Sequence, residues 1–125
     1  MTRILVIDDE PNFANMVKLN LEATGYYEVY TENSGSNALA MALRYRPDLV
    51  LLDVILPDKE GPEVMFEFKK DAQAKNIPIV FLTATVTKDE VIAQEGIIGG
   101  HAFLAKPGSI KELVACIEKQ LGAFN

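Results

Sequence analysis

Five side chains that could take part in one reaction stand at the ends of short apolar stretches. They are Asp8, Asp9, Asp53, Thr83 and Lys106. If these positions converge, the three carboxylates repel one another unless a cation lies among them. Two cations suggest themselves, the ammonium group of Lys106 and a hard divalent metal such as Mg²⁺, which prefers oxygen ligands. A carboxylate, a metal, a lysine and a hydroxyl together predict transfer of a phosphoryl group onto the carboxylate.

Each of these residues also has a purely structural interpretation, which the sequence leaves open. Asp53 follows four apolar residues, and aspartate is common where a chain turns. Asp8 and Asp9 could stabilise the positive N-terminus of a following helix, a role that is compatible with metal binding. Thr83 could be an ordinary strand-end residue, and Lys106 a solvated surface lysine. The decisive question is whether the five positions meet at one edge of the fold.

The stretches that precede these residues are predicted to be strands of a parallel sheet. The predicted strands occupy residues 4–7, 28–31, 48–52, 78–82 and 102–105. Short apolar runs bounded by polar residues or proline are typical of strands buried on both faces. Helix signals alternate with them and begin near Pro11, Ser34, Pro62, Thr87 and Ile110. This alternation predicts one doubly wound α/β domain, a (βα)5 unit with a five-stranded parallel sheet.

The composition is that of an ordinary globular chain and argues against several classes of function. The 125 residues are 49% hydrophobic and 24% charged, which suits one domain over residues 1–125. A net charge of −6 argues against direct binding to a nucleic acid backbone. No apolar run approaches the roughly 20 residues of a membrane span, and the N-terminus lacks a signal-peptide pattern. With Cys116 as the lone cysteine, a cytoplasmic location is expected.

The residues at the predicted strand ends belong to five short motifs that run in order along nearly the whole chain. The motifs are Ile-Asp-Asp-Glu at 7–10, Leu-Leu-Asp at 51–53, Leu-Pro-Asp-Lys-Glu-Gly at 56–61, Leu-Thr-Ala at 82–84 and Lys-Pro at 106–107. No single motif is specific, but the five in register resemble the response-regulator receiver domain of two-component signalling. The resemblance implies a flavodoxin-like fold with strand order 2-1-3-4-5.

The resemblance implies a phosphoacceptor site centred on Asp53. This residue would accept a phosphoryl group from the phosphohistidine of a histidine kinase or a histidine phosphotransfer protein. Mg²⁺ would be held by Asp8, Asp9, Asp53 and the backbone carbonyl of Ile55. The domain itself would perform at most self-directed phosphoryl transfer and autodephosphorylation, so we expect a switch rather than an enzyme.

The resemblance also implies how phosphorylation becomes a signal. Lys106 and Thr83 would contact the phosphoryl group, Phe103 would move inward, and the peptide bond before Pro107 would be cis. The surface of the fourth helix, the fifth strand and the last helix would change and bind a downstream protein target, or an output domain that this chain lacks. Gly108 stands where the family usually has phenylalanine, which bears on this surface. The sequence does not decide between a stand-alone regulator and one piece of a longer protein.

Three other interpretations account for parts of the pattern. A flavin-binding protein of the same topology would need a Gly/Ser/Thr-rich phosphate loop after the first strand, where this chain has acidic residues 8–10. An aspartate-nucleophile phosphatase would carry its nucleophile on the first strand and a second aspartate two residues later, whereas this pair is adjacent. A receiver that binds partners without phosphorylation is the nearest alternative, and the complete set of site residues argues against it.

Overall fold

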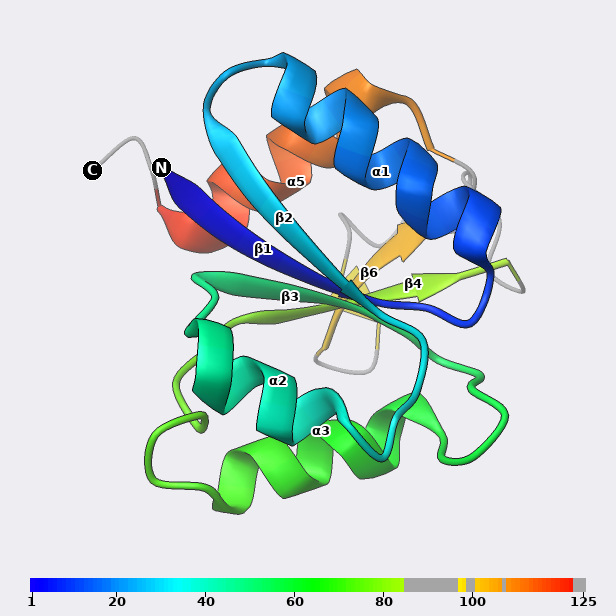
Figure 1. The fold of residues 1–125 in the computed structure, drawn as a ribbon, viewed down its shortest axis with the longest axis vertical. Helices are drawn as coiled ribbons and strands as arrows, with labels where there is room; N and C mark the ends of the chain where they lie inside the picture. The colour runs from blue at the N-terminus through cyan, green and yellow to red at the C-terminus, as the bar shows by residue number, and fades with distance from the viewer. Residues whose placement is uncertain (85–96, 99–100, 107, 123–125) are drawn as a thin grey trace.

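A single twisted sheet forms the centre of the molecule (Figure 1). The computed structural model describes residues 1–84, 97–98, 101–106 and 108–122. Within them the strand order is β2-β1-β3-β4-β6-β5. The parallel strands are β1 (Thr2–Ile7), β2 (Tyr27–Glu32), β3 (Leu49–Asp53), β4 (Ile79–Thr83) and β6 (His101–Ala105). The five parallel strands and their predicted order are confirmed, with β6 as the predicted fifth strand.

A sixth strand adds to the predicted sheet. β5 (Ile97–Ile98) pairs antiparallel with β6 at the edge of the sheet. No strand was predicted here, because the two isoleucines stand between glycines in a stretch typical of a loop. The parallel core of the sheet is unaffected by this addition.

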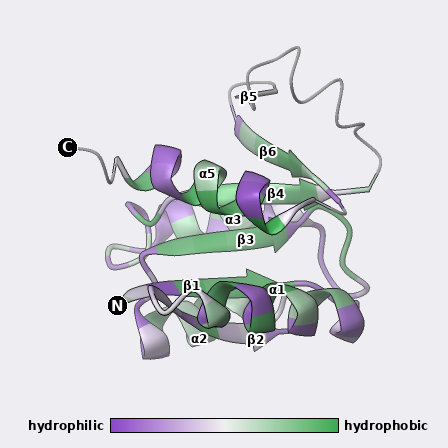
Figure 2. Ribbon diagram, turned by 90° about the horizontal axis from the view of Figure 1, so that it is seen from above, coloured by the Kyte–Doolittle hydropathy of each residue, from purple (hydrophilic) through white to green (hydrophobic). Residues whose placement is uncertain are grey.

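The strands are apolar because helices cover both faces of the sheet. Every residue of β3 and of β4 is buried, as are the last four residues of β1. Figure 2 shows β1, β3 and β4 largely in green, whereas the helices alternate between purple and green residues. Successive side chains of a strand point to opposite faces. Ile4 and Val6 therefore join one hydrophobic cluster, while Leu5 and Ile7 join the other.

Four helices lie within the described residues, two on each face of the sheet (Figure 1). The first face carries α1 (Pro11–Ala23) and α5 (Ile110–Leu121), and the second carries α2 (Ala38–Tyr45) and α3 (Gly61–Lys70). The helix predicted to begin near Thr87 falls outside the described residues. Across the described part of the chain, no helix has both the length and the apolar character needed to cross a membrane.

The starts of the helices show which local signals acted as expected. Pro11 and Pro62 lie in the first two positions of α1 and α3, where their missing N–H groups cost nothing. Ser109 caps α5, with its Oγ accepting a hydrogen bond from Glu112 N and its own N–H donating to the Glu112 carboxylate. The prediction that Ser34 caps α2 is wrong, because α2 begins at Ala38 and the hydroxyl of Ser34 bonds elsewhere.

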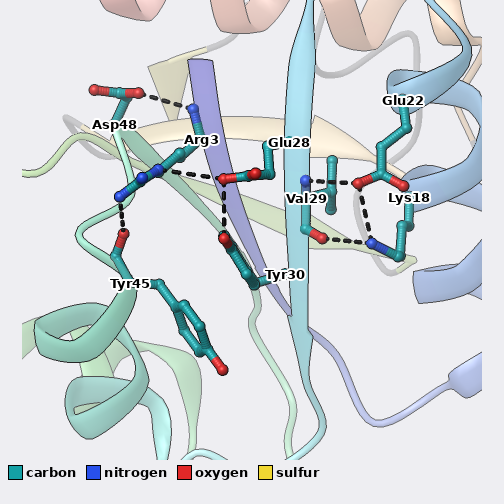
Figure 3. Close-up of polar contacts among 8 residues, drawn as sticks. All are labelled: Arg3, Lys18, Glu22, Glu28, Val29, Tyr30, Tyr45 and Asp48. Carbon is teal, nitrogen blue, oxygen red and sulfur yellow. Dashed lines mark hydrogen bonds and ion pairs between the residues drawn. The ribbon is translucent and has the colours of Figure 1, made fainter. Parts of the chain in front are cut away.

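Side chains of α1 protect the outer edge of β2 (Figure 3). Lys18 Nζ donates to the carbonyl of Val29 at 2.8 Å, and the N–H of Val29 donates to Glu22 Oε2 at 3.1 Å. Lys18 and Glu22 also pair with each other at 3.0 Å, one helical turn apart. An edge strand exposes unpaired backbone groups that invite pairing with other chains. This arrangement satisfies both backbone groups of Val29 from within the domain.

Arg3, near the amino end of β1, ties this strand to its neighbours (Figure 3). Its Nε lies 3.3 Å from Glu28 Oε1 on β2, and its Nη1 donates to the carbonyl of Tyr45 at the end of α2 at 3.0 Å. Its backbone N–H donates to Asp48 Oδ2 at 2.8 Å. These contacts lie near the amino ends of the strands, whereas Asp8, Asp53 and Thr83 lie at or just beyond the carboxyl ends.

Candidate functional site

The carboxyl ends of the central strands bring the predicted side chains together. Pairing aligns Ile7 with Leu52 across β1 and β3, and Asp53 with Leu82 across β3 and β4. Because Asp8 directly follows β1 and Thr83 ends β4, neighbouring strands deliver their polar residues at nearly the same level. The structure brings Asp8, Asp53 and Lys106 together, as expected from the sequence, with the Lys106 ammonium in contact with both carboxylates.

Asp53 ends β3 and is held almost entirely within the protein. It is only 7% exposed, although aspartate is seldom buried without a partner. Its Oδ1 accepts a hydrogen bond from the N–H of Ile55 at 3.2 Å, and its Oδ2 lies 3.4 Å from Lys106 Nζ. A carboxylate fixed by a rigid strand, with one oxygen directed toward a lysine, is positioned to act as a nucleophile.

Lys106 is the cation around which the carboxylates gather. Its Nζ lies 2.8 Å from Asp8 Oδ2, 2.5 Å from Glu10 Oε1 and 3.4 Å from Asp53 Oδ2. The ammonium also lies 4.5 Å from the centre of the Phe13 ring, within the range of a cation–π interaction. The side chain is only 6% exposed, so the surface interpretation of this lysine is wrong.

Burial and pairing act on the protonation of this cluster in definite directions. Burial alone would lower the pKa of Lys106, but its hydrogen bonds to Asp8 and Glu10 outweigh burial and raise the pKa. Burial raises the pKa of Asp8, and the hydrogen bonds from Lys106 and from the N–H of Glu10 oppose that rise only in part. Lys106 therefore stays cationic, while burial makes the charged form of Asp8 less favourable than it is in water.

The acidic groups fit a hard divalent cation. Carboxylate oxygens of Asp8, Glu10 and Asp53 lie within 4.8 Å of one another. Oxygen ligands from one or two carboxylates, completed by water and phosphate, are what Mg²⁺ commonly takes. Glu10 was not among the residues predicted from the sequence, whereas the predicted Asp9 is exposed and is not part of this group. The only sequence signal for Glu10 was its place in the Asp-Asp-Glu run.

The residues predicted to form the switch lie on the neighbouring strands. Thr83 is 2% exposed, and its carbonyl accepts a hydrogen bond from the N–H of Lys106 at 2.9 Å. Phe103 of β6 is half-buried, with its ring centre 5.2 Å from that of Phe81 on β4. Pro107, whose peptide bond was predicted to be cis, lies outside the described residues. Thr83 thus lies at the strand end nearest the cluster, while Phe103 lies further back on the adjacent strand, paired with Phe81.

Gly61 brings the start of α3 against the end of β3. Its N–H donates to the carbonyl of Val54 at 2.7 Å. A Cβ at this position would lie 2.6 Å from the backbone oxygen of Asp53 and 2.9 Å from Val54 Cα. Both neighbours are backbone atoms, which cannot rotate away. Glycine is therefore required here by close approach to the segment that carries Asp53.

Asp58 joins the loop after β3 to the loop before α2. Its carboxylate accepts hydrogen bonds from the hydroxyls of Ser34 and Ser36 and from the N–H groups of Gly35 and Ser36. These hydrogen bonds together lower the pKa of Asp58 well below its ordinary value of 3.8, and the bond from the Ser36 hydroxyl has the largest effect. This clamp fixes the far end of the loop that leaves Asp53. Sequence reasoning treated Asp58 only as part of a motif.

The Asp58 clamp predicts a specific dependence of stability on pH. A carboxylate with a lowered pKa stabilises the fold above its unfolded pKa, and this contribution is lost as the pH falls toward the folded pKa. Asp58→Asn should therefore be less stable than the parent at neutral pH, and the gap should narrow below about pH 4. Urea unfolding followed by circular dichroism at several pH values measures this gap. Ser36→Ala should show a smaller gap, and a gap independent of pH would contradict the clamp.

Comparison with known proteins gives one consistent family. The response regulator receiver domain family matches residues 4–118. The chain is 40% identical over 112 residues to a protein from Mycobacterium tuberculosis named "Probable transcriptional regulatory protein TcrX". That alignment covers 89% of this chain and 46% of the relative, so the chain spans about half the length of the curated relative it matches.

Solved structures of similar chains share the fold. The chemotaxis protein CheY4 of Vibrio cholerae is 32% identical with a TM-score of 0.81, covering 97% of this chain and 99% of its own. The receiver domain of the sensor histidine kinase PA1611 of Pseudomonas aeruginosa is 26% identical with a TM-score of 0.80, covering 97% and 98%. The latter was solved with a magnesium ion coordinated in its active site cleft. The strand order, the carboxylate–lysine cluster and these matches agree: the chain belongs to the response regulator receiver domain family.

Proposed function

We propose that this domain is a phosphorylation-activated switch in which Asp53 is the phosphoacceptor. The observation that carries the proposal is the contact of Lys106 with both Asp8 and Asp53 at the carboxyl edge of the sheet. An ammonium that pairs with the acceptor carboxylate before the reaction can pair with a phosphoryl oxygen after it, without moving far. The phosphodonor is a histidine kinase or a histidine phosphotransfer protein, and the exchange takes place in the cytoplasm.

In the proposed reaction an oxygen of the Asp53 carboxylate attacks the phosphorus of a phosphohistidine. The new O–P bond forms as the N–P bond breaks, and the departing imidazole nitrogen takes up a proton. Lys106 offsets the charge that gathers on the phosphoryl oxygens. The hydroxyl of Thr83, at the end of the adjacent strand, turns toward the new group. The product is an acyl phosphate, which adds about one negative charge and new acceptor oxygens at this edge.

Mg²⁺ belongs to this proposal as the cofactor. When bound, it neutralises charge on the phosphoryl group and on the carboxylates around it. Asp8, Asp9, Asp53 and the backbone carbonyl of Ile55 would hold it. The support from this chain is that carboxylate oxygens of Asp8 and Asp53, with one of Glu10, lie within 4.8 Å of one another. Asp9 is exposed and lies outside this group. A magnesium ion in the cleft of the PA1611 receiver domain is a parallel in a similar protein.

The phosphoryl group is converted into a change of surface through β4 and β6. The Lys106 N–H and the Thr83 carbonyl already join the two strands, and the Phe81 and Phe103 rings pack across them. A shift of Thr83 toward the phosphoryl group is therefore felt at Phe103. We propose that the face made by the predicted fourth helix, β6 and α5 then binds a downstream protein or an output domain. Residues 1–125 act as one such receiver unit.

The experiment that tests the proposal is intact mass spectrometry after incubation with acetyl phosphate. The parent should gain one phosphoryl group with Mg²⁺ and none in the presence of a chelator. Asp53→Asn should gain none, while Asp48→Asn, at the other end of β3, should behave as the parent. A phosphoryl group that persists in Asp53→Asn would assign the acceptor to another residue. No gain in a parent that demonstrably binds Mg²⁺ would favour a partner-binding domain that works without phosphorylation.

A further inference from the structure

The hydrogen-bonding capacity of Lys106 is fully used. An ammonium group has three N–H donors. The three acceptors are Asp8, Glu10 and Asp53, at 2.8, 2.5 and 3.4 Å from Nζ. If Lys106 is to bind an incoming phosphoryl oxygen while it still pairs with the Asp53 carboxylate, one of the three present contacts must be given up. The burial of the three carboxylates identifies which one.

The three partners of Lys106 differ sharply in their access to water. The side chain of Asp8 is 0% exposed and that of Asp53 is 10% exposed, whereas that of Glu10 is 62% exposed. A buried carboxylate that loses its counter-charge pays a large desolvation cost. An exposed carboxylate exchanges its partner for water at little cost, and exposed ion pairs contribute about 1 kcal/mol or less. Glu10 is therefore the partner that can leave.

The backbone at Glu10 leaves its side chain free for this role. Glu10 stands directly before α1 in an extended conformation, with φ −96° and ψ 101°. Its side chain makes no capping hydrogen bond to the helix. The Glu10 N–H donates to Asp8 Oδ1 at 2.9 Å, so the backbone is anchored beside the cluster while the carboxylate extends over Lys106. The carboxylate can swing away without disturbing α1.

We infer that Glu10 is a positioning residue that occupies the third donor of Lys106 until a phosphoryl group arrives and then releases it. This inference rests on the proposed function, because it assigns Lys106 to the phosphoryl oxygens. Before the reaction, Glu10 accepts one N–H of the ammonium while Asp8 and Asp53 accept the others. On release, the freed N–H turns to the phosphoryl oxygen. Glu10 thereby sets how readily the site accepts a phosphoryl group.

The test compares Glu10→Gln with Glu60→Gln at saturating Mg²⁺. Glutamine keeps the shape of the side chain but not its charge, so it holds Lys106 less strongly. Glu60 is an exposed glutamate before α3 whose side chain makes no capping bond, and its replacement removes the same charge. Two quantities are measured: the maximal rate of phosphorylation by acetyl phosphate, and the equilibrium affinity for beryllium fluoride, a non-reacting phosphoryl analogue, followed by NMR. Isothermal titration gives the Mg²⁺ affinity of each unphosphorylated protein.

Glu10→Gln should raise both the phosphorylation rate and the beryllium fluoride affinity by about two- to fivefold, the value of an exposed ion pair. Its Mg²⁺ affinity should fall by less than about threefold, and Glu60→Gln should match the parent in all three measurements. Equal behaviour of the two variants would overturn the inference. So would slower phosphorylation with Mg²⁺ binding weakened by about tenfold or more, because Glu10 would then be a metal ligand.

The same experiment separates this inference from the function on which it rests. A parent that takes up neither a phosphoryl group nor beryllium fluoride would overturn both. A parent that takes up both, with no gain in Glu10→Gln, would overturn the role of Glu10 while the phosphoacceptor function stands. Thermal unfolding of the variants with chelator present should give similar midpoints, since the Glu10 side chain is exposed. Similar midpoints would show that a gain in phosphorylation rate does not come from a change in folding stability.

Discussion

Lys106→Met is expected to make the stability of this domain depend on divalent cations. Methionine fills a similar volume but leaves the buried carboxylates of Asp8 and Asp53 without their counter-charge. Removing one partner of a buried ion pair typically costs about 3–5 kcal/mol. We expect a loss of about 3 kcal/mol in the free energy of unfolding when divalent cations are absent. Part of the cost is avoided because Asp8, whose pKa is already raised by burial, takes up a proton more readily.

Mg²⁺ should restore much of what the Lys106→Met substitution removes. With one positive charge fewer in the cluster, the carboxylates bind the cation more tightly, and a ligand that binds only the folded state stabilises it. Urea unfolding by circular dichroism, with chelator and then with Mg²⁺, should show a larger gain for the variant than for the parent. Lys111→Met, an exposed lysine of α5, should change neither value by more than about 0.5 kcal/mol. An equal Mg²⁺ effect in parent and variant would show that Lys106 does not neutralise the metal-binding carboxylates.

Gly61→Ala is expected to impair both folding and phosphoryl acceptance. The added methyl group would lie 2.6 Å from the Asp53 carbonyl oxygen and 2.9 Å from Val54 Cα, so α3 and the end of β3 must separate. Overpacking of this kind costs about 1–3 kcal/mol. The separation also displaces the backbone of Asp53. Because misplacing a reacting group by about 1 Å can cost a hundredfold in rate, we expect phosphorylation to slow by about ten- to a hundredfold.

The measurements for Gly61→Ala are urea unfolding and the rate of phosphorylation by acetyl phosphate. Gly108→Ala is the matched control, because its Cβ would lie 3.4 Å from the Ala105 carbonyl oxygen, an ordinary contact. The control should keep its stability within about 0.5 kcal/mol of the parent. If Gly61→Ala were as stable and as fast as Gly108→Ala, the close approach of α3 would not matter for the position of Asp53.

The two substitutions probe different requirements of the same site. Lys106 supplies the charge that allows carboxylates to gather at a buried edge, whereas Gly61 supplies the space that lets helix α3 pack against the end of β3. The Asp58 clamp adds a third element by fixing the loop between β3 and α3. A phosphoacceptor needs all three, because a carboxylate nucleophile must be both ionised and held in place.

The parallel core of the fold and the strand ends that carry the site could both be predicted from the order of residue types along the chain. Apolar runs of strand length, separated by helical periodicity, admit few arrangements other than a doubly wound sheet. Once that sheet is assumed, the residues that follow the strands must meet at one edge. Asp8, Asp53 and Lys106 could therefore be predicted to lie close together, and they do. Local signals also placed Pro11 and Pro62 at helix starts.

Which of the neighbouring polar residues belong to the cluster could not be predicted in the same way. Glu10 and Asp9 are adjacent in the sequence, yet Glu10 contacts Lys106, while Asp9 is exposed and lies outside the carboxylate group. Ser34 was expected to cap α2, but its hydroxyl donates a hydrogen bond to Asp58, 24 residues away in the chain. The physical reason is that these choices depend on side-chain direction and on contacts between distant loops. Periodicity along the chain reports which face a residue occupies, and folding in three dimensions decides what that residue meets there.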